Sequence, residues 1–197
     1  MTQLVLASTS PFRKALLERL GQPFSTVSPD TDETRRPGET ARALVERLSE
    51  DKARAVASQF SNALIIGSDQ VAILGEEILG KPETHERAIK QLSAASGNEV
   101  LFLTGLCLLN TATGRTQAEV VPFTVKFRPL TTRQIDNYLR REQPYNCAGS
   151  FKSEGLGIAL FEAMKGEDPN TLIGLPLIHL ITLLSNEGVD VLESGCS

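Results

Sequence analysis

The chain opens on an apolar run that leads, without a spacer, into a hydroxyl-rich turn and then a helix. Residues 3–7 predict a buried strand, and the three residues that follow are Ser8, a threonine and Ser10. Ser10 suits a helix N-cap and Pro11 suits the first helical position, so we expect a helix over residues 11–20. This opening predicts a strand-turn-helix unit of an α/β fold.

Arg13 is an unusual residue for the first turn of this helix, because a positive charge there opposes the helix dipole. A negative group is therefore expected beside it. Free backbone N–H groups, hydroxyls and a guanidinium that converge on one point would form a cradle for phosphate. The alternative is a plain strand-to-helix connection with a surface arginine.

The rest of the chain mixes strands and helices without strict alternation. The apolar residues 64–67 predict a central strand, which residues 71–74 continue or pair with nearby. Residues 99–109 and 117–127 predict an antiparallel pair. Further elements are expected as helices over residues 40–59, 84–95, 132–141 and 176–185 and as a strand over residues 158–163. We therefore expect a mixed α/β fold with a mixed sheet.

Length and charge narrow the class of protein. A chain of 197 residues predicts one domain over residues 1–197, with room for two lobes and with a tail after about residue 188. The net charge of −4 argues against a protein that binds nucleic acid through a basic face. We expect no signal peptide, because the first residues lack its pattern, and no membrane span, because no apolar run is long enough.

The cysteines and histidines do not indicate a metal site. Cys107, Cys147 and Cys196 have no metal-ligand spacing, which favours a reducing cytoplasm, and Cys107 is predicted to be a small core residue. His85 and His179 are far apart and are predicted to be structural.

Two charged residues lie where chemistry is often placed. Asp69 follows the predicted central strand, a position that suits a metal ligand or a general base, although a turn aspartate that bonds its own backbone fits equally well. Lys81 lies between a glycine and a proline, so its ammonium would be presented with little freedom to a phosphate. The default alternative for Lys81 is a solvated surface side chain.

Two loops add candidate groups. Carboxylates of residues 30–33, together with Asp69, would suit Mg²⁺, although Asp30 and Asp32 fit a solvated loop better. Residues 148–157 surround a phenylalanine, a lysine and a glutamate with glycines, which suggests a binding loop. Neither a dinucleotide fingerprint nor a phosphate-binding P-loop motif is present in the sequence.

Taken together, these residues resemble the Maf family of nucleoside triphosphate pyrophosphatases. The match runs in order along nearly the whole chain through the segments 6–13, 32–33, 51–53, 67–69, 80–82, 148–149, 154–155 and 174–176. The resemblance implies a fold like that of inosine triphosphate pyrophosphatase, with a mixed twisted sheet and two lobes flanking a cleft. It implies a cytoplasmic homodimer that needs a divalent cation, Mg²⁺ or Mn²⁺. It also implies hydrolysis between the α- and β-phosphates of a nucleotide.

The resemblance assigns roles residue by residue. Asp69 would accept the proton of the attacking water, and Glu33 and Asp69 would bind the metal. The triphosphate would be held by Ser8, Arg13, Lys52 and Lys81. Cations at these positions would offset charge on the leaving pyrophosphate.

Three positions resemble the branch of the family that hydrolyses 7-methyl-GTP, namely Phe12, Gln70 and Glu154. A carboxylate at Glu154 can accept both N–H donors of the guanine edge, whereas uracil and thymine offer one N–H. Phe12 replaces an arginine that is common in the family, which removes a like charge from the vicinity of a cationic methylated base and adds an aromatic face.

The leading interpretation is an enzyme that removes modified nucleotides from the pool, with a role in cell division arrest. The alternatives are a pyrophosphatase for dTTP, UTP or another modified nucleotide, and a non-catalytic nucleotide-binding regulator of septum formation. The presence of Asp69, Glu33 and Lys81 together argues against the regulator, because a pure binder has no need of a base.

Overall fold

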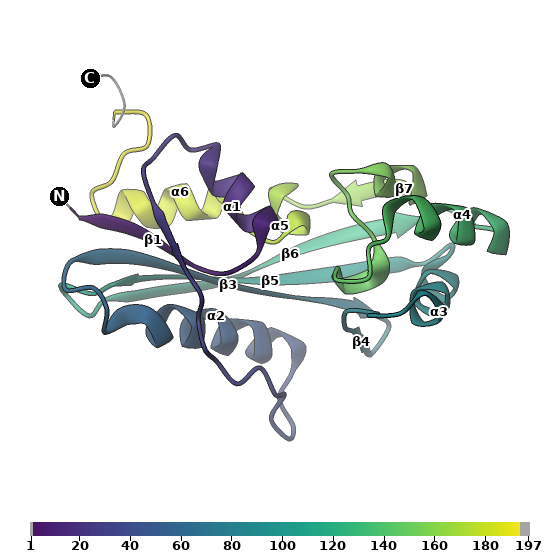
Figure 1. The fold of residues 1–197 in the computed structure, drawn as a ribbon, viewed down its shortest axis with the longest axis horizontal. Coiled ribbons are helices and arrows are strands. Elements are labelled where there is room, and N and C mark those ends of the chain that lie inside the picture. Colours follow the sequence, from purple (N-terminus) through teal and green to yellow (C-terminus); the bar gives the residue numbers. More distant parts are fainter. Residues whose placement is uncertain (1, 194–197) are drawn as a thin grey trace. The chain divides into compact units, whose positions relative to one another are not determined.

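The computed structural model describes residues 2–193, and these form two compact units. The first unit comprises residues 2–69, Thr104–Val121 and residues 174–193, and the second comprises Gln70–Leu103 and Pro122–Ile173. The three long strands each contribute residues to both units; they are β3 (Ala63–Leu74), β5 (Glu99–Asn110) and β6 (Thr116–Phe127) (Figure 1). Cys196 lies outside the described residues.

The strands form a mixed, seven-stranded sheet in the order β2-β1-β3-β5-β6-β7, with β4 paired to β3. Strand β1 (Gln3–Ala7) is parallel both to β2 (Ser25–Val27) and to β3. Strand β4 (Glu77–Leu79) is antiparallel to β3, and β7 (Phe161–Lys165) is antiparallel to β6. The mixed α/β class expected from the sequence is therefore confirmed.

In the first unit, helix α2 (Ala41–Ala57) lies on one face of the sheet, and α1 (Pro11–Glu18) and α6 (Leu177–Asn186) lie on the other (Figure 1). Two glycines let α2 approach the strands closely. A Cβ at Gly67 would overlap the Ser49 carbonyl oxygen, and a Cβ at Gly105 would overlap that of Val45. This close packing fixes where the side chains of α2 lie relative to the end of β3 in this unit.

The core beneath α2 is apolar. Ala53 and Val56 of the helix pack with residues of β1, β3 and β5, including Val5, Ile65 and Cys107. Cys107 is fully buried, as expected, and burial raises the pKa of its thiol to about 12.

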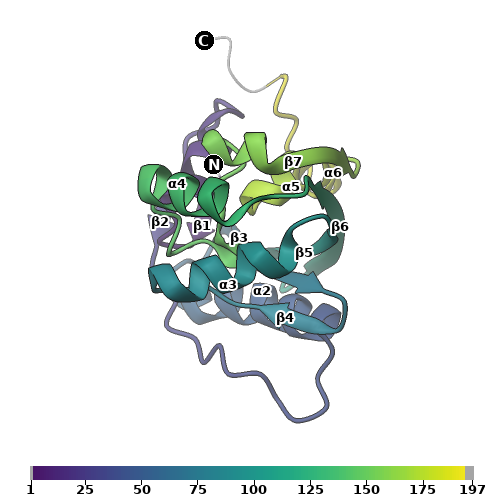
Figure 2. The ribbon, with the colours of Figure 1, turned by 90° about the vertical axis from the view of Figure 1, so that its right-hand side faces the viewer.

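In the second unit, α3 (His85–Ala95) and α4 (Thr132–Glu142) pack against each other (Figure 2). Thr131 begins α4 with a capping box, in which its side chain and that of Gln134 exchange hydrogen bonds with the backbone. The core contains edge-to-face aromatic contacts of Phe151 with three other rings, those of Phe102, Phe127 and Phe161. A short helix, α5 (Asn170–Ile173), completes this unit.

The structure corrects several predicted boundaries. The helix expected over residues 11–20 ends at Glu18, and the one expected over residues 40–59 spans Ala41–Ala57. The strand expected over residues 158–163 is wrong in its first half, where a 3₁₀ segment, Leu156–Leu160, precedes β7. The tight fold of the chain there depends on Gly157, where a Cβ would overlap the Lys152 carbonyl oxygen.

Strand β4 was not predicted. Its three residues pair with β3 through a turn at Gly75, whose φ of 61° lies in the left-handed region that favours glycine. So short a strand carries too little periodicity to be recognised. Within residues 2–193, no helix has the length and apolar character needed to cross a membrane.

Candidate functional site

The centre of the candidate site is a buried lysine between two carboxylates, all within the first unit. Lys52 Nζ lies 2.7 Å from Glu33 Oε1 and 2.7 Å from Asp69 Oδ1. Lys52 belongs to the buried face of α2, and Asp69 lies in β3, where its residue is also buried. Glu33 reaches the ammonium from the loop between β2 and α2, with 59% of its side chain exposed. The single lysine ammonium thus forms ion pairs with two carboxylates, one buried and one open to solvent.

This arrangement has the chemistry of a cation site. The two carboxylate oxygens of Glu33 and Asp69 converge on one positive group. Mg²⁺ is commonly held by one or two protein carboxylates, with water and substrate phosphates completing its octahedron, so this pair fits such an ion. Among residues 2–193, no group of three or more His, Cys, Asp or Glu side chains is arranged to hold a metal. A divalent cation here would therefore depend on oxygen ligands from its substrate.

The turn before α1 is organised by two serines. Ser10 is the N-cap of the helix, as predicted, and its Oγ accepts a hydrogen bond of 3.4 Å from the Arg13 N–H. Ser8, which is buried, accepts a hydrogen bond of 3.1 Å from the Ser10 N–H. The expectation of free N–H groups at this turn is therefore wrong for Ser10 and Arg13, because the serine hydroxyls already use them. These bonds fix the direction in which the helix begins.

Arg13 is held in place from a distant part of the sequence. Its Nε donates a hydrogen bond of 2.8 Å to the Gly174 carbonyl oxygen, and the Ser68 hydroxyl donates one of 2.9 Å to the same oxygen. Burial lowers the pKa of the guanidinium, while the charges of Asp69 and Glu33 act to raise it. These two carboxylates are the negative groups that the position of Arg13 required.

The remaining candidates of the first unit are Phe12 and the loop residues Asp30 and Asp32. Phe12 is half-buried beside Arg13 in α1. Asp30 and Asp32 are exposed, and Asp32 Oδ1 accepts a hydrogen bond of 2.9 Å from the Thr34 N–H, as a solvated loop residue would. The first unit thus brings together Arg13, Lys52, Glu33 and Asp69 as mutually interacting charges.

The other three candidates belong to the second unit. Gln70 is half-buried, and its Nε2 donates hydrogen bonds to the carbonyl oxygens of Thr171 (2.7 Å) and Leu172 (3.3 Å) in α5. Lys81 is exposed between Gly80 and Pro82, and Glu154 is exposed in a turn. The charges of both act on the thiol of Cys147, whose pKa is raised chiefly by burial.

Two residues of the site were missed as contributors. Ser68 and Gly174 belong to segments that carry the family resemblance, but nothing in the sequence indicated that both hold Arg13. The contact between Arg13 and Gly174 joins residues 161 positions apart. Local periodicity carries no information on such a contact, and the only available signal was the short Gly-Leu-Pro segment at 174–176.

Comparison with known proteins gives a consistent picture. Residues 3–187 match the Maf family, described as Maf-like protein. A 7-methyl-GTP pyrophosphatase of Nitrosococcus oceani is 62% identical over 189 residues, which cover 96% of this chain and 95% of that protein. A 7-methyl-GTP pyrophosphatase of Colwellia psychrerythraea is 57% identical over 192 residues, covering 98% and 96% respectively.

A solved structure resembles the chain in fold. The Staphylococcus aureus Ham1 protein aligns with a TM-score of 0.54 at 14% sequence identity, covering 94% of this chain and 99% of that one. The likeness supports the fold expected from the resemblance to inosine triphosphate pyrophosphatase.

Proposed function

This chain belongs to the Maf family, and on that premise we propose that it hydrolyses 7-methyl-GTP to 7-methyl-GMP and pyrophosphate. Relatives at 56–62% identity over nearly the full length carry the name of that activity. The observation that best supports the chemistry is the Lys52 ammonium held between Glu33 and Asp69, with Arg13 beside them. Convergent cations and carboxylates are what hydrolysis of a polyphosphate requires.

In the proposed reaction, Asp69 accepts a proton from the attacking water. The water oxygen forms a bond to the α-phosphorus, the bond from that phosphorus to the bridging oxygen breaks, and pyrophosphate leaves. Arg13 and Lys52, with the Ser8 hydroxyl and Lys81, bind the phosphate oxygens and offset the charge that develops on the leaving group. A divalent cation, Mg²⁺ or Mn²⁺, held by Glu33 and Asp69 would supply Lewis acidity and lower the pKa of water.

Base choice is assigned to Phe12, Gln70 and Glu154. The exposed carboxylate of Glu154 is available to accept the two N–H donors of a guanine edge. Phe12 offers a neutral ring to a cationic methylated base. Because the Gln70 amide donates to carbonyl oxygens of α5, its contribution is to orient that short helix.

We also propose that the protein works in the cytoplasm as a homodimer and removes modified nucleotides from the pool. A small nucleotide as the ligand accords with the names of the relatives. We further propose that the protein has a role in cell division arrest.

The test is pyrophosphate release by the full chain with Mg²⁺ or Mn²⁺, measured across the common nucleoside triphosphates and 7-methyl-GTP. We expect the highest kcat/KM with 7-methyl-GTP and a loss of about 10³-fold in Asp69→Asn, the range for removal of a general base. Higher turnover of UTP or dTTP would support the proposed reaction but contradict 7-methyl-GTP as its preferred substrate. Nucleotide binding without turnover would favour a non-catalytic regulator.

A further inference from the structure

Glu33 lies on a loop that needs an anchor. The loop connects β2 to α2, and apart from a turn at residues 37–38 it has no regular structure. Residues 32–38 are all exposed, so no buried apolar side chain fixes this stretch. Nevertheless, Glu33 reaches Lys52 at 2.7 Å. The position of its carboxylate must therefore depend on polar contacts of the neighbouring residues.

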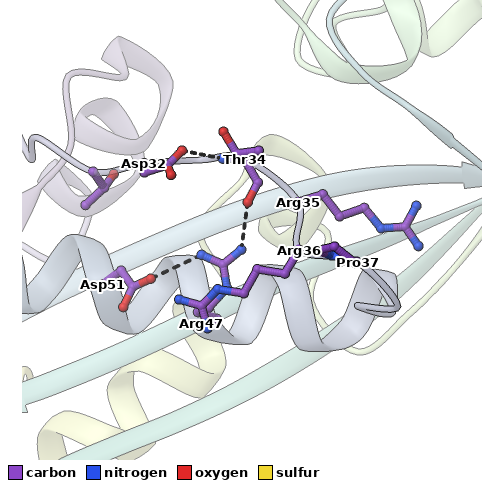
Figure 3. A pocket seen from close by; sticks show the side chains of 8 residues that line it. Asp32, Thr34, Arg35, Arg36, Pro37, Arg47 and Asp51 are labelled. Carbon is purple, nitrogen blue, oxygen red and sulfur yellow. Dashed lines mark hydrogen bonds and ion pairs between the residues drawn. The ribbon is translucent and has the colours of Figure 1, made fainter.

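Arg47 of α2 supplies these contacts with its whole guanidinium. Its Nη2 donates a hydrogen bond of 3.2 Å to the carbonyl oxygen of Thr34, the residue directly after Glu33. Its Nε and Nη2 bind the two carboxylate oxygens of Glu39 at 2.7 and 2.9 Å. Its Nη1 binds Asp51 Oδ2 at 3.2 Å, one turn further along the same helix (Figure 3). A planar fork with five donors suits such a set of acceptors.

Glu39 extends this anchoring to the whole turn of the loop. Its Oε2 accepts a hydrogen bond of 3.0 Å from the Arg36 N–H, and its own N–H donates to the Arg36 carbonyl oxygen at 3.1 Å. Arg35 Nε donates to the Glu39 carbonyl oxygen at 2.8 Å. The side chains of Arg47 and Glu39 are only 14% and 8% exposed, so this ion pair is largely shielded from water. Hydrogen bonding to Arg47 lowers the pKa of Glu39 to about 2.

The surroundings of Arg47 are open. A pocket of about 300 Å³ lies beside it and is lined by polar and charged side chains together with Pro37 (Figure 3). The loop therefore rests on α2 through Arg47 at Thr34 and through Lys52 at Glu33. Removing the first contact takes away the backbone anchor next to Glu33, so that the position of its carboxylate depends far more on the ion pair with Lys52.

We infer that Arg47 is a positioning residue of the divalent-cation site: by binding Thr34 and Glu39 to α2, it keeps the Glu33 carboxylate beside Asp69. This inference rests on the proposed function only in that it takes Glu33 and Asp69 as the cation ligands. Arg47 acts through the loop and touches neither the cation nor the nucleotide. Supporting groups of this kind, one step removed from a metal, commonly change metal affinity when substituted.

The test compares Arg47→Gln with Arg54→Gln in the full chain. Arg54 lies on the same helix and forms an exposed i,i+4 pair with Glu50 at 3.6 Å, which makes it a matched control. Mn²⁺ binding is measured by titration of the free-ion electron paramagnetic resonance signal, without nucleotide and with a slowly hydrolysed triphosphate analogue. Amide hydrogen exchange of residues 31–39 reports the order of the loop.

For Arg47→Gln we expect Mn²⁺ binding about 10-fold weaker and faster exchange confined to the loop, with Arg54→Gln like the wild type. Unchanged Mn²⁺ affinity in Arg47→Gln, or an equal change in both variants, would overturn the inference even if the loop exchanged faster. If Arg47→Gln does not fold, Glu39→Gln takes its place under the same criteria. Mn²⁺ binding that depends on Arg47 but brings no pyrophosphate release would contradict the proposed function and leave this inference standing.

Discussion

The two units hold their candidate residues in different ways. In the first, Lys52 and Asp69 are buried and paired, and Arg13 is fixed by the Gly174 carbonyl. In the second, Lys81 and Glu154 are exposed on turns. The phosphate-binding and catalytic groups of the first unit are thus positioned in advance by the fold. Two groups proposed to meet the substrate from the second unit are not: Lys81 for the phosphates and Glu154 for the base.

This difference separates residues that can be substituted at little cost in stability from residues that cannot. A buried charge pair can change only if both partners change, because a single substitution leaves an uncompensated charge. An exposed carboxylate such as Glu154 can be replaced at little cost in stability. The residues that select the base can therefore differ between branches of one family, whereas the charged residues Lys52 and Asp69 of the first unit cannot. Phe12 is the exception to this division, since it is a candidate for base selection that belongs to the first unit.

The largest effect is expected when the Lys52 ammonium, the positive charge at the centre of the first unit, is removed. In Lys52→Met, the carboxylates of Glu33 and Asp69 lose their shared partner, so we expect a loss of about 1–3 kcal/mol in the free energy of unfolding. We also expect kcat/KM to fall about 10³-fold for every nucleotide, as for loss of a preorganised charge. Denaturant unfolding and pyrophosphate release measure the two effects. Lys14→Met, at an exposed pair with Glu18, serves as the control, and equal losses in both variants would contradict the account.

A second substitution tests the anchor of Arg13. Gly174 has a φ of 119°, and a Cβ there would lie 3.4 Å from Arg13 Nε. Gly174→Ala should cost about 1–3 kcal/mol of stability through backbone strain. Because the strain would shift the Gly174 carbonyl that binds Arg13 Nε, the substitution should also raise KM about 10-fold, equivalent to about 1.4 kcal/mol of binding.

Gly188→Ala is the control, because it introduces backbone strain at a glycine away from Arg13. Gly188 has a φ of 77°, with nothing within 4 Å of a Cβ. We expect Gly188→Ala to lower stability and leave KM unchanged. An equal rise in KM in both alanine variants would show that Gly174 does not act through Arg13.

A smaller effect is expected at Phe12. Phe12→Arg adds a positive charge where a cationic base is to be bound. It should lower kcat/KM for 7-methyl-GTP relative to GTP about fivefold, near 1 kcal/mol. Phe12→Leu removes only the aromatic face and should lower the same ratio by less. An unchanged ratio in both variants would show that Phe12 does not select the base. Base selection would then be left to the candidates of the second unit.

The smallest effect concerns pH. The pKa of Glu39 is lowered from 4.5 to about 2, chiefly by its hydrogen bonds with Arg47 and then by the Arg36 N–H. A lowered pKa in the folded state means that this pair stabilises the protein above pH 4.5 and loses its contribution as the pH falls toward 2. The protection factors of the loop amides, which are corrected for the intrinsic pH dependence of exchange, should therefore fall over that interval in the wild type. In Glu39→Gln the protection factors should already be low at pH 4.5 and should change less, whereas an equal pH dependence of protection in both proteins would contradict the assignment.

Local sequence signals predicted the parts of the molecule that local physics controls. Ser10 as an N-cap and Cys107 as a core residue are confirmed, because capping and apolar runs act over a few residues. The strand expected over residues 158–163 was wrong in its first half, where a 3₁₀ segment follows a fold of the chain so tight that a Cβ at Gly157 would overlap the Lys152 carbonyl oxygen.

The charged centre could be predicted only in part, because its ion pairs join a loop, a helix and a strand. Asp69 and Lys52 could be singled out, but not that one ammonium joins both to Glu33. Arg47, which anchors the loop of Glu33, resembled any surface arginine of an amphipathic helix. Contacts between segments far apart in the chain require the fold itself.

The most direct test of the division between the units is the ratio of kcat/KM for 7-methyl-GTP to that for UTP in three proteins: the wild type, Arg13→Gln and Glu154→Gln. The account predicts that Arg13→Gln lowers both values by the same factor and leaves the ratio unchanged. Glu154→Gln should shift the ratio about 10-fold toward UTP, the discrimination expected of a paired contact to one base edge. A ratio that moves with Arg13→Gln, or stays fixed in Glu154→Gln, would contradict it.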